Sequence, residues 1–181
     1  NIMSILKKIN TFCALALLTG LCLNFTATTA QAAGELDKIK ERGKIRIAVF
    51  SDKPPFGYID ENGENKGYDV YFAKRIAKDL LGDENKVEFV LVEAASRMEV
   101  LEADKADIVL ANFTVTPDRT KQVDFAKPYM KVALGVVSPE GAAITDVAQL
   151  KGKKLIVNKG TTADSYFSKN HPEVTLVKYD Q

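Results

Sequence analysis

The chain has 181 residues, which is enough for one or two domains with a sizeable buried core. Its composition is that of an ordinary globular protein, with 46% hydrophobic and 27% charged residues. The formal net charge of +1 gives no electrostatic case for binding nucleic acid or an anionic membrane surface, so we expect neither partner.

The first 32 residues have the pattern of a secretory signal peptide. Lys7 and Lys8 form a basic start, and the apolar run over residues 12–23 that follows is short for a bilayer span. Residues 30–32, A-Q-A, provide an A-x-A cleavage site. We therefore expect residues 1–32 to direct export and to be removed. A membrane anchor and an N-terminal core helix are the alternatives.

Both cysteines of the chain, Cys13 and Cys22, lie inside this segment. Residues 33–181 therefore hold no cysteine that could form a disulfide, act as a reactive thiol or bind a metal. Lipid attachment at Cys22 is disfavoured, because the residue before a lipidated cysteine is small and Leu21 is not.

From residue 35 onward, helix patterns and strand patterns alternate along the chain. Apolar residues with a period of 3.6 predict helices, and short β-branched runs between turn residues predict strands. The alternation predicts an α/β fold with mainly parallel sheets. We expect helices at 35–42, 70–81, 97–104, from 117 onward, at 145–150 and within 160–170. We expect strands at 45–50, 86–93, 106–112, 131–138, 153–158 and 174–179.

Three local signals define ends of these elements. Asp69 is expected to cap the helix that follows it. Ser96 and Glu99 have the S-x-x-E spacing of a capping box. The Asn-Gly pair at 62–63 is a strong hairpin signal.

Signatures of enzymes, metal sites and cofactor sites are scarce. The chain has no GxGxxG, GxxxxGK[ST], HExxH or GxSxG motif. Its one histidine, His171, falls in a predicted loop and is expected to be solvated. We therefore expect no catalytic residue, no metal and no cofactor.

The first of two strand-to-helix junctions is NFTVTPDRT at residues 112–120. Thr116, which precedes a proline, predicts a helix start there. Arg119 then puts a cation at the positively charged end of that helix, which is unfavourable unless an anion compensates it. Arg119 is either a receptor for an anionic ligand, or it forms a salt bridge with Asp118 or Asp124, or it is exposed to solvent.

The second junction is NKGTTADS at residues 158–165. Gly160 lets another backbone approach closely, and Thr161 or Thr162 caps the next helix. Ligands of parallel α/β sheets bind beyond the carboxyl ends of the strands, where both junctions lie, and helix N-termini attract anions. The pair of junctions therefore predicts a site for a small carboxylate, with simple helix capping as the alternative for the second junction.

Four motifs follow one another along the chain: PPFGY at 54–58, GYDV at 67–70, TVTPDR with FAKPY at 114–129, and KGTT at 159–162. In this order and spacing they resemble the extracytoplasmic solute-binding proteins of polar amino-acid ABC importers, bacterial family 3 type. The resemblance covers essentially the whole chain after the signal. It implies a periplasmic-binding-protein-like fold, in which two α/β lobes joined by a hinge near residues 129–132 close over a ligand.

The resemblance also implies domain boundaries. Residues 33–130 would form the first segment of lobe 1, and residues 131–181 part of lobe 2. In the family, a later carboxylate of lobe 2 binds the ligand ammonium, and the chain then returns to complete both lobes. We therefore expect this chain to be C-terminally truncated and not to bind ligand by itself.

The resemblance places a ligand site at the two junctions. The arginine of the family motif T-x-T-x-x-R, here Arg119, clamps the ligand α-carboxylate, and Thr162 donates to the same carboxylate from the opposite wall. The other residues that it places around the ligand are Asn112, Thr114, Gly160, Thr161, Phe50, Lys53 and Phe56.

Two residues of this site restrict the class of amino acid that it would accept. Lys53 stands where many members carry an aromatic, and Phe50 stands where binders of basic amino acids carry an acid. The resemblance therefore implies a small, neutral or mildly acidic amino acid, and residues 159–167 and 177–181 resemble the cysteine-binding branch. It further implies a periplasmic protein that delivers its ligand to an ABC permease in the inner membrane.

Two other functions stay open. A periplasmic dehydratase of the cyclohexadienyl type would keep the carboxylate clamp and add a general acid, and turnover of prephenate or arogenate would identify it. A ligand-sensing domain of a receptor would need a transmembrane segment after residue 181.

Overall fold

The structure, a computed structural model, describes residues 34–181. The chain divides into two units: residues 1–41, of which 34–41 are described, and residues 42–181. The predicted signal peptide and the question of a lipid at Cys22 lie outside the described residues. Within residues 34–181, no helix is both long enough and apolar enough to cross a membrane.

Helix α2 (Glu35–Arg42) forms where its amphipathic pattern predicts. Two acids in its first turn, Glu35 and Asp37, are favourable at the positively charged end of a helix. Lys38 binds Glu35 at 2.6 Å. Gly43 follows with a φ of 72°, the left-handed conformation that commonly ends a helix.

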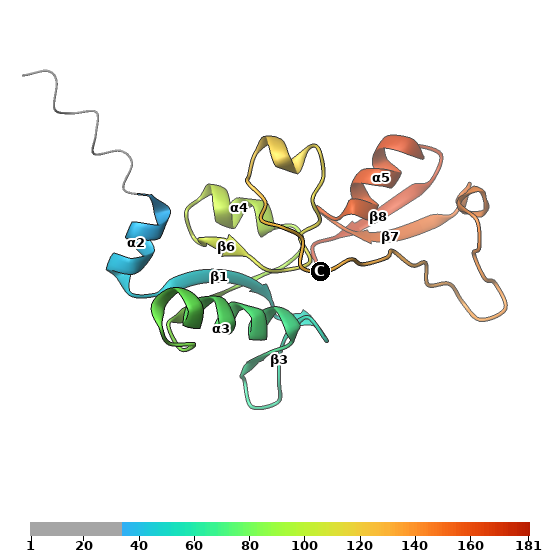
Figure 1. The fold of residues 1–181 in the computed structure, drawn as a ribbon. Helices are drawn as coiled ribbons and strands as arrows, with labels where there is room; N and C mark the ends of the chain where they lie inside the picture. The colour runs from blue at the N-terminus through green and yellow to red at the C-terminus, as the bar shows by residue number, and fades with distance from the viewer. Residues whose placement is uncertain (1–33) are drawn as a thin grey trace, which may run out of the picture. The chain divides into compact units, whose positions relative to one another are not determined.

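The larger sheet has three parallel strands in the order β5–β1–β6 (Figure 1). β1 (Ile45–Phe50) is central, with β5 (Val87–Val92) on one side and the short β6 (Ile108–Val109) on the other. Five of the six β1 residues are buried, as is typical of a parallel strand covered on both faces. The predicted parallel pairing is confirmed, although the strand expected at 106–112 is only two residues long.

Two helices cover this sheet. α3 (Tyr68–Leu81) packs against β1 and β5, and α4 (Arg97–Glu102) packs against β6. The residues that α3 buries include Val70, Ala73 and Ala77, which lie on the apolar face that its periodicity predicts.

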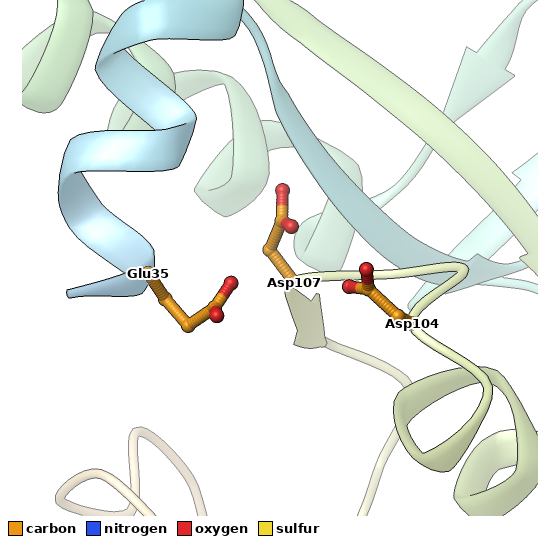
Figure 2. A group of neighbouring side chains, drawn as sticks. All are labelled: Glu35, Asp104 and Asp107. Atoms are coloured by element: carbon orange, nitrogen blue, oxygen red, sulfur yellow. The ribbon is translucent and has the colours of Figure 1, made fainter. Parts of the chain in front are cut away.

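An arginine of β1 binds the turn between α4 and β6. Arg46 donates to Asp107 Oδ1 at 2.7 Å and 3.2 Å and to Asp104 Oδ1 at 2.8 Å. Arg42 forms a further ion pair with Asp107. Figure 2 shows Asp104 and Asp107 on this turn. Because arginines bind both carboxylates, they tie the start of β6 to β1.

A second, antiparallel sheet follows β1. It consists of β2 (Asp52–Lys53), β3 (Gly57–Ile59) and β4 (Asn65–Lys66). The turn at 62–63 joins β3 to β4, so the predicted hairpin is confirmed. Asp60 accepts two backbone hydrogen bonds across this turn, each of 2.9 Å.

The third sheet pairs β7 (Lys154–Asn158) with β8 (Thr175–Tyr179) in parallel, and α5 (Thr162–Asn170) connects them. A 3-10 helix, η3 (Val147–Leu150), stands where a short helix was predicted. The buried hydrophobic residues of this part are Leu150, Val157, Phe167 and Val174. The predicted boundary between lobes at residues 130 and 131 stays a prediction.

The strand predicted over residues 131–138 is wrong, because this segment has no regular secondary structure. Val132, Leu134 and Val137 are 51%, 67% and 100% exposed. A strand persists only when a neighbour binds its backbone groups, and no strand of the described part pairs with this segment. A β-branched composition alone is therefore not enough to form one here.

Two predicted helix caps are also wrong. α3 begins at Tyr68 with Gly67 as its N-cap, and Asp69 is a fully buried residue of the first turn. Ser96 precedes α4 with a helical backbone conformation, and its hydroxyl bonds to the backbone of Glu93 at 3.2 Å and 3.3 Å. A capping residue needs a non-helical backbone to reach the free N–H groups of the first turn.

Candidate ligand-binding site

The first junction ends in one turn of 3-10 helix rather than in the predicted α-helix. η2 spans Arg119–Lys121 and buries none of its residues. A longer helix gains its stability from packing an apolar face, which this turn lacks. Thr116 still serves the start of the turn, because its Oγ1 accepts a hydrogen bond from the N–H of Arg119 at 3.3 Å.

The guanidinium of Arg119 joins the two junctions. Its Nη1 donates to the carbonyl of Thr114 at 2.7 Å, and its Nη2 donates to the carbonyl of Gly160 at 2.7 Å. The Cζ atom lies 4.3 Å from the centre of the Phe113 ring, a cation–π contact. Burial lowers the pKa of Arg119, but arginine keeps its charge in proteins.

Among residues 34–181, Arg119 forms no ion pair, so neither Asp118 nor Asp124 is its salt-bridge partner. Asp118 instead binds Lys169, and it pairs with Lys121 at 3.4 Å. Hydrogen bonds to these two lysines, Lys169 first, hold the pKa of Asp118 below its ordinary value. Because the contacts of the Arg119 guanidinium within the described residues are with carbonyls and an aromatic ring and not with a carboxylate, it can still bind an anion.

At the second junction, capping accounts for the first of the two threonines. Thr161 is the N-cap of α5, and its Oγ1 accepts a hydrogen bond from the N–H of Asp164 at 3.2 Å. The same hydroxyl donates to the carbonyl of Asn158 at 2.7 Å. Thr162, the first residue of the helix, has no such role in the described hydrogen bonds.

Gly160 makes the close backbone approach that the sequence predicts. Its φ is 70°, and a Cβ atom there would lie 3.1 Å from the carbonyl oxygen of Ala94. A side chain at this position would be strained and would crowd the loop before α4. Only glycine fits both requirements without strain.

Eight of the nine predicted site residues line one cavity of about 510 Å³. They are Phe50, Lys53, Phe56, Asn112, Thr114, Arg119, Thr161 and Thr162. Gly160, the ninth, reaches Arg119 through its carbonyl. The other walls come from Pro54, Ala94, Arg97, Val132, Ala133, Leu134 and Asn158. The structure thus brings the predicted residues together, and their role in binding stays a prediction.

Arg97 lines the cavity but is not among the residues that the sequence predicts for the site. It is 3% exposed and donates hydrogen bonds of 2.9–3.1 Å to four backbone carbonyls. Those carbonyls belong to Ala94, Ala111, Asn112 and Gly160. Burial and, second, the positive charge of Arg119 lower the pKa of Arg97 to about 10. The sequence contains one indication that Arg97 is buried. An apolar residue, Val100, lies three positions later on the same face of the helix, and this face is the buried one.

The walls of this cavity carry positive charge. Lys53, Arg97 and Arg119 line it, and no carboxylate does. Lys53 is paired with Asp52, whereas neither arginine has an acidic partner among the described residues. The Oδ1 atom of Asn112 is buried and accepts no hydrogen bond within residues 34–181. The cavity therefore offers two cations to an anion and one free acceptor to a donor.

A neighbouring cavity of about 630 Å³ shares Arg119, Thr161 and Thr162 with the first. Its walls carry the carboxylates of Asp118 and Asp164, which makes it less suited to an anion. Phe50 and Lys53 do not line it. The smaller cavity thus matches the predicted site better.

Comparison with known proteins relates the chain to amino-acid-binding proteins. The model of the family "Bacterial extracellular solute-binding proteins, family 3" matches residues 45–178. A glutamine-binding protein of Geobacillus stearothermophilus is 33% identical over 154 residues, which are 84% of this chain and 59% of that protein.

Two solved structures are more similar. A solute receptor for L-cysteine of Neisseria gonorrhoeae is 64% identical, with a TM-score of 0.78. A cysteine-binding protein of Campylobacter jejuni is also 64% identical, with a TM-score of 0.79. Each alignment covers 81% of this chain and 59% of the other. The chain thus spans 59% of the length of each of these three relatives.

Proposed function

The chain belongs to the bacterial extracellular solute-binding proteins of family 3, and on that premise we propose that the full-length protein binds a free amino acid in the 510 Å³ cavity. One observation carries the proposal: Arg97 and Arg119, which have no acidic partner in the described part of the chain, line a cavity without carboxylates. An α-carboxylate supplies the negative charge that this pair lacks, and it matches the two-pronged geometry of a guanidinium.

The two ends of an amino acid have different partners in this cavity. The carboxylate would bind Arg119 and the free N–H groups at the start of α5, next to Thr162. The ammonium group would donate to Asn112 Oδ1, the buried acceptor that has no partner within residues 34–181. Exclusion of water on binding would strengthen both contacts, because charges attract more strongly at low dielectric constant.

We assign the ligand class from the side-chain end of the cavity. Phe50, Phe56 and Leu134 provide apolar walls there, and Lys53 provides a cation. A basic side chain would meet Lys53 and Arg97 with like charge, so a small neutral or acidic one fits better. The names of the two relatives at 64% identity support L-cysteine as the ligand.

Binding without chemistry is the proposed activity, with delivery of the ligand to an ABC permease. The named relatives are binding proteins or receptors rather than enzymes. General acid catalysis needs a titratable group beside the ligand, and among the described residues that line this cavity the one such charged group, Lys53, is already paired with Asp52. The family is extracellular, and the predicted signal peptide supports a location in the periplasm.

Calorimetric titration of the full-length protein with each standard amino acid and with cystine tests the proposal. We expect cysteine to bind most tightly, with one ligand per protein. Arg119→Ala removes the clamp and should raise the dissociation constant at least about 100-fold. Arg75→Ala is the matched control, because Arg75 is an exposed arginine of α3 paired with Asp79 at 3.2 Å. This variant should bind within about twofold of the wild type.

Two results would overturn the proposal. One is an Arg119→Ala variant that keeps wild-type affinity, which would show that the clamp is elsewhere. The other is turnover: if bound cysteine, prephenate or arogenate were recovered in altered form, the protein would be an enzyme. Mass spectrometry of the ligand after incubation distinguishes binding from turnover.

A further inference from the structure

Asp69, in the first turn of α3, is a fully buried acid. Acids are favourable at this end of a helix, but an exposed acid provides that benefit without being desolvated. A fully buried carboxylate indicates specific partners. Asp69 therefore has a role beyond the start of its helix.

The partners of Asp69 come from two distant segments. Its Oδ1 accepts a hydrogen bond from the Tyr129 hydroxyl at 2.9 Å, across 60 residues of sequence. The backbone N–H of Asn112 lies near enough to lower the pKa of this carboxyl, whereas Oδ2 of Asp69 has no hydrogen-bond partner within residues 34–181. The Tyr129 ring packs against Tyr68 and Phe72, with ring centres 6.0 Å and 5.2 Å apart. The tyrosine is thus held at both its ring and its hydroxyl.

Each partner continues directly into a wall of the ligand cavity. Tyr129 precedes the extended segment that contributes residues 132–134 to the wall. Asn112 contributes its side chain, and its φ of 47° is a conformation that residues other than glycine rarely adopt. Arg97 binds the carbonyl of Asn112 at 3.0 Å, so Asn112 is held from both sides.

The backbone around Asp69 holds a third wall. The N–H groups of Tyr68 and Asp69 donate to the carbonyls of Pro55 and Phe56, each at 2.9 Å. Pro54 and Phe56 line the cavity beside the predicted side-chain contact. Three walls of one cavity thus converge on a single turn of helix.

We propose that Asp69 is a positioning residue for the ligand cavity, which fixes Asn112 and the segment after Tyr129 in their binding geometry. This proposal rests on the proposed function of the cavity. Asp69 does not line the cavity, so it acts through its two partners. Loss of the Tyr129 contact would let residues 132–134 move, and loss of the carboxylate beside Asn112 would let its backbone leave the left-handed conformation.

Calorimetric titration of full-length variants with cysteine tests the proposal. Tyr129→Phe keeps the ring packing and removes only the hydroxyl, and Asp69→Ala removes the carboxylate that accepts its hydrogen bond. Each should raise the dissociation constant about tenfold or more, with a binding stoichiometry that stays near one. The double variant should bind no more weakly than Asp69→Ala, since both changes break the same contact. Asp69→Asn keeps Oδ1 and should restore affinity to within about threefold of the wild type.

Tyr71→Phe is the matched control, because Tyr71 is a 68% exposed tyrosine of the same helix, and it should bind as the wild type does. A purely structural role would lower the melting temperature and leave the affinity of the folded protein unchanged. If the wild type binds cysteine and Tyr129→Phe binds it equally well, Asp69 is not a positioning residue.

Backbone NMR relaxation of the ligand-free protein separates this proposal from the proposed function. Tyr129→Phe should lower the order parameters of Asn112 and of residues 132–134, whether or not the wild type binds an amino acid. If the wild type binds nothing and the order parameters still fall as expected, the proposed function fails and the positioning contact stands. Unchanged order parameters at both places would overturn the positioning contact itself.

Discussion

At the scale of single residues, the described part of the chain buries two charged residues. Asp69 and Arg97 are 0% and 3% exposed, and neither forms an ion pair among the described residues. Burial raises the pKa of Asp69 to about 6, although the hydrogen bond from Tyr129 acts in the opposite direction. Asp69 is stabilised by the hydrogen bond from Tyr129, and Arg97 by four carbonyls and by the rings of Phe50 and Phe113, which makes both residues sensitive to substitution.

The stability of the protein should depend on pH through Asp69. The folded carboxyl binds its proton more tightly than the unfolded carboxyl, whose pKa is about 3.8. Its contribution to the free energy of unfolding is therefore fully present below pH 3.8 and is lost as the pH rises through about 6. We expect a loss of up to about 3 kcal/mol over this window.

Urea unfolding of the wild type and of Asp69→Asn between pH 4 and pH 8 measures this effect. The amide does not titrate, so Asp69→Asn should gain stability relative to the wild type as the pH rises. Two curves that run parallel over the whole range would show that the buried carboxyl is not the titrating group.

At the scale of elements, the start of α3 decides how the loop before it is placed. Gly67 is the N-cap and has a φ of 115°. A Cβ atom there would lie 2.2 Å from the carbonyl oxygen of Phe56, which no side chain can tolerate without a shift of backbone. The glycine of the GYDV motif thus allows the helix to bind a cavity-lining loop directly.

Alanine substitution of the glycines at the two ends of α3 separates two contributions to the free energy of unfolding. One is the backbone strain of a positive φ, and the other is the steric clash with the Phe56 carbonyl. Gly82, the C-cap, also has a positive φ of 80°, but open space surrounds its Cβ position. Gly82→Ala should lower the free energy of unfolding by about 1 kcal/mol from strain alone. Gly67→Ala should lower it by roughly 3 kcal/mol, because the Phe56 carbonyl must also move. Equal losses at both ends, measured by urea unfolding, would contradict the close packing at Gly67.

At the scale of the whole molecule, two arginines connect distant segments through one carbonyl. The carbonyl of Gly160 accepts hydrogen bonds from Arg97 and from Arg119, which lie 63 and 41 residues away in sequence. A carbonyl carries only partial negative charge, whereas a ligand carboxylate carries a full one. Binding should therefore strengthen the connection between these segments and stabilise the fold.

Cysteine at about 100 times its dissociation constant should raise the free energy of unfolding of the full-length protein by about 2.7 kcal/mol. Differential scanning calorimetry with and without cysteine measures this as a rise in melting temperature. The rise should vanish in Arg119→Ala and persist in Arg75→Ala. A rise that persists in Arg119→Ala would mean that cysteine stabilises the protein from another site.

Much of the fold and the candidate site could be predicted from local patterns. The helix period over 70–81, the hairpin at 62–63 and the alternation of strands with helices are confirmed. The family resemblance, which rested on four short motifs, is confirmed by the match over residues 45–178. These features share a cause, since neighbouring residues determine which face is apolar and where the backbone can turn.

The sequence by itself determined the α/β class, the two strand-to-helix junctions and the family to which the chain belongs. Only the tertiary structure decided that Asp69 binds Tyr129 instead of capping a helix, that Arg97 is a buried cation of the cavity, and that residues 131–138 form no strand. In each case the partner lies far away in sequence or is absent from the described sheets. The residue type determines which kinds of bond a side chain can form, and the packing of distant segments determines which partner lies within bonding distance.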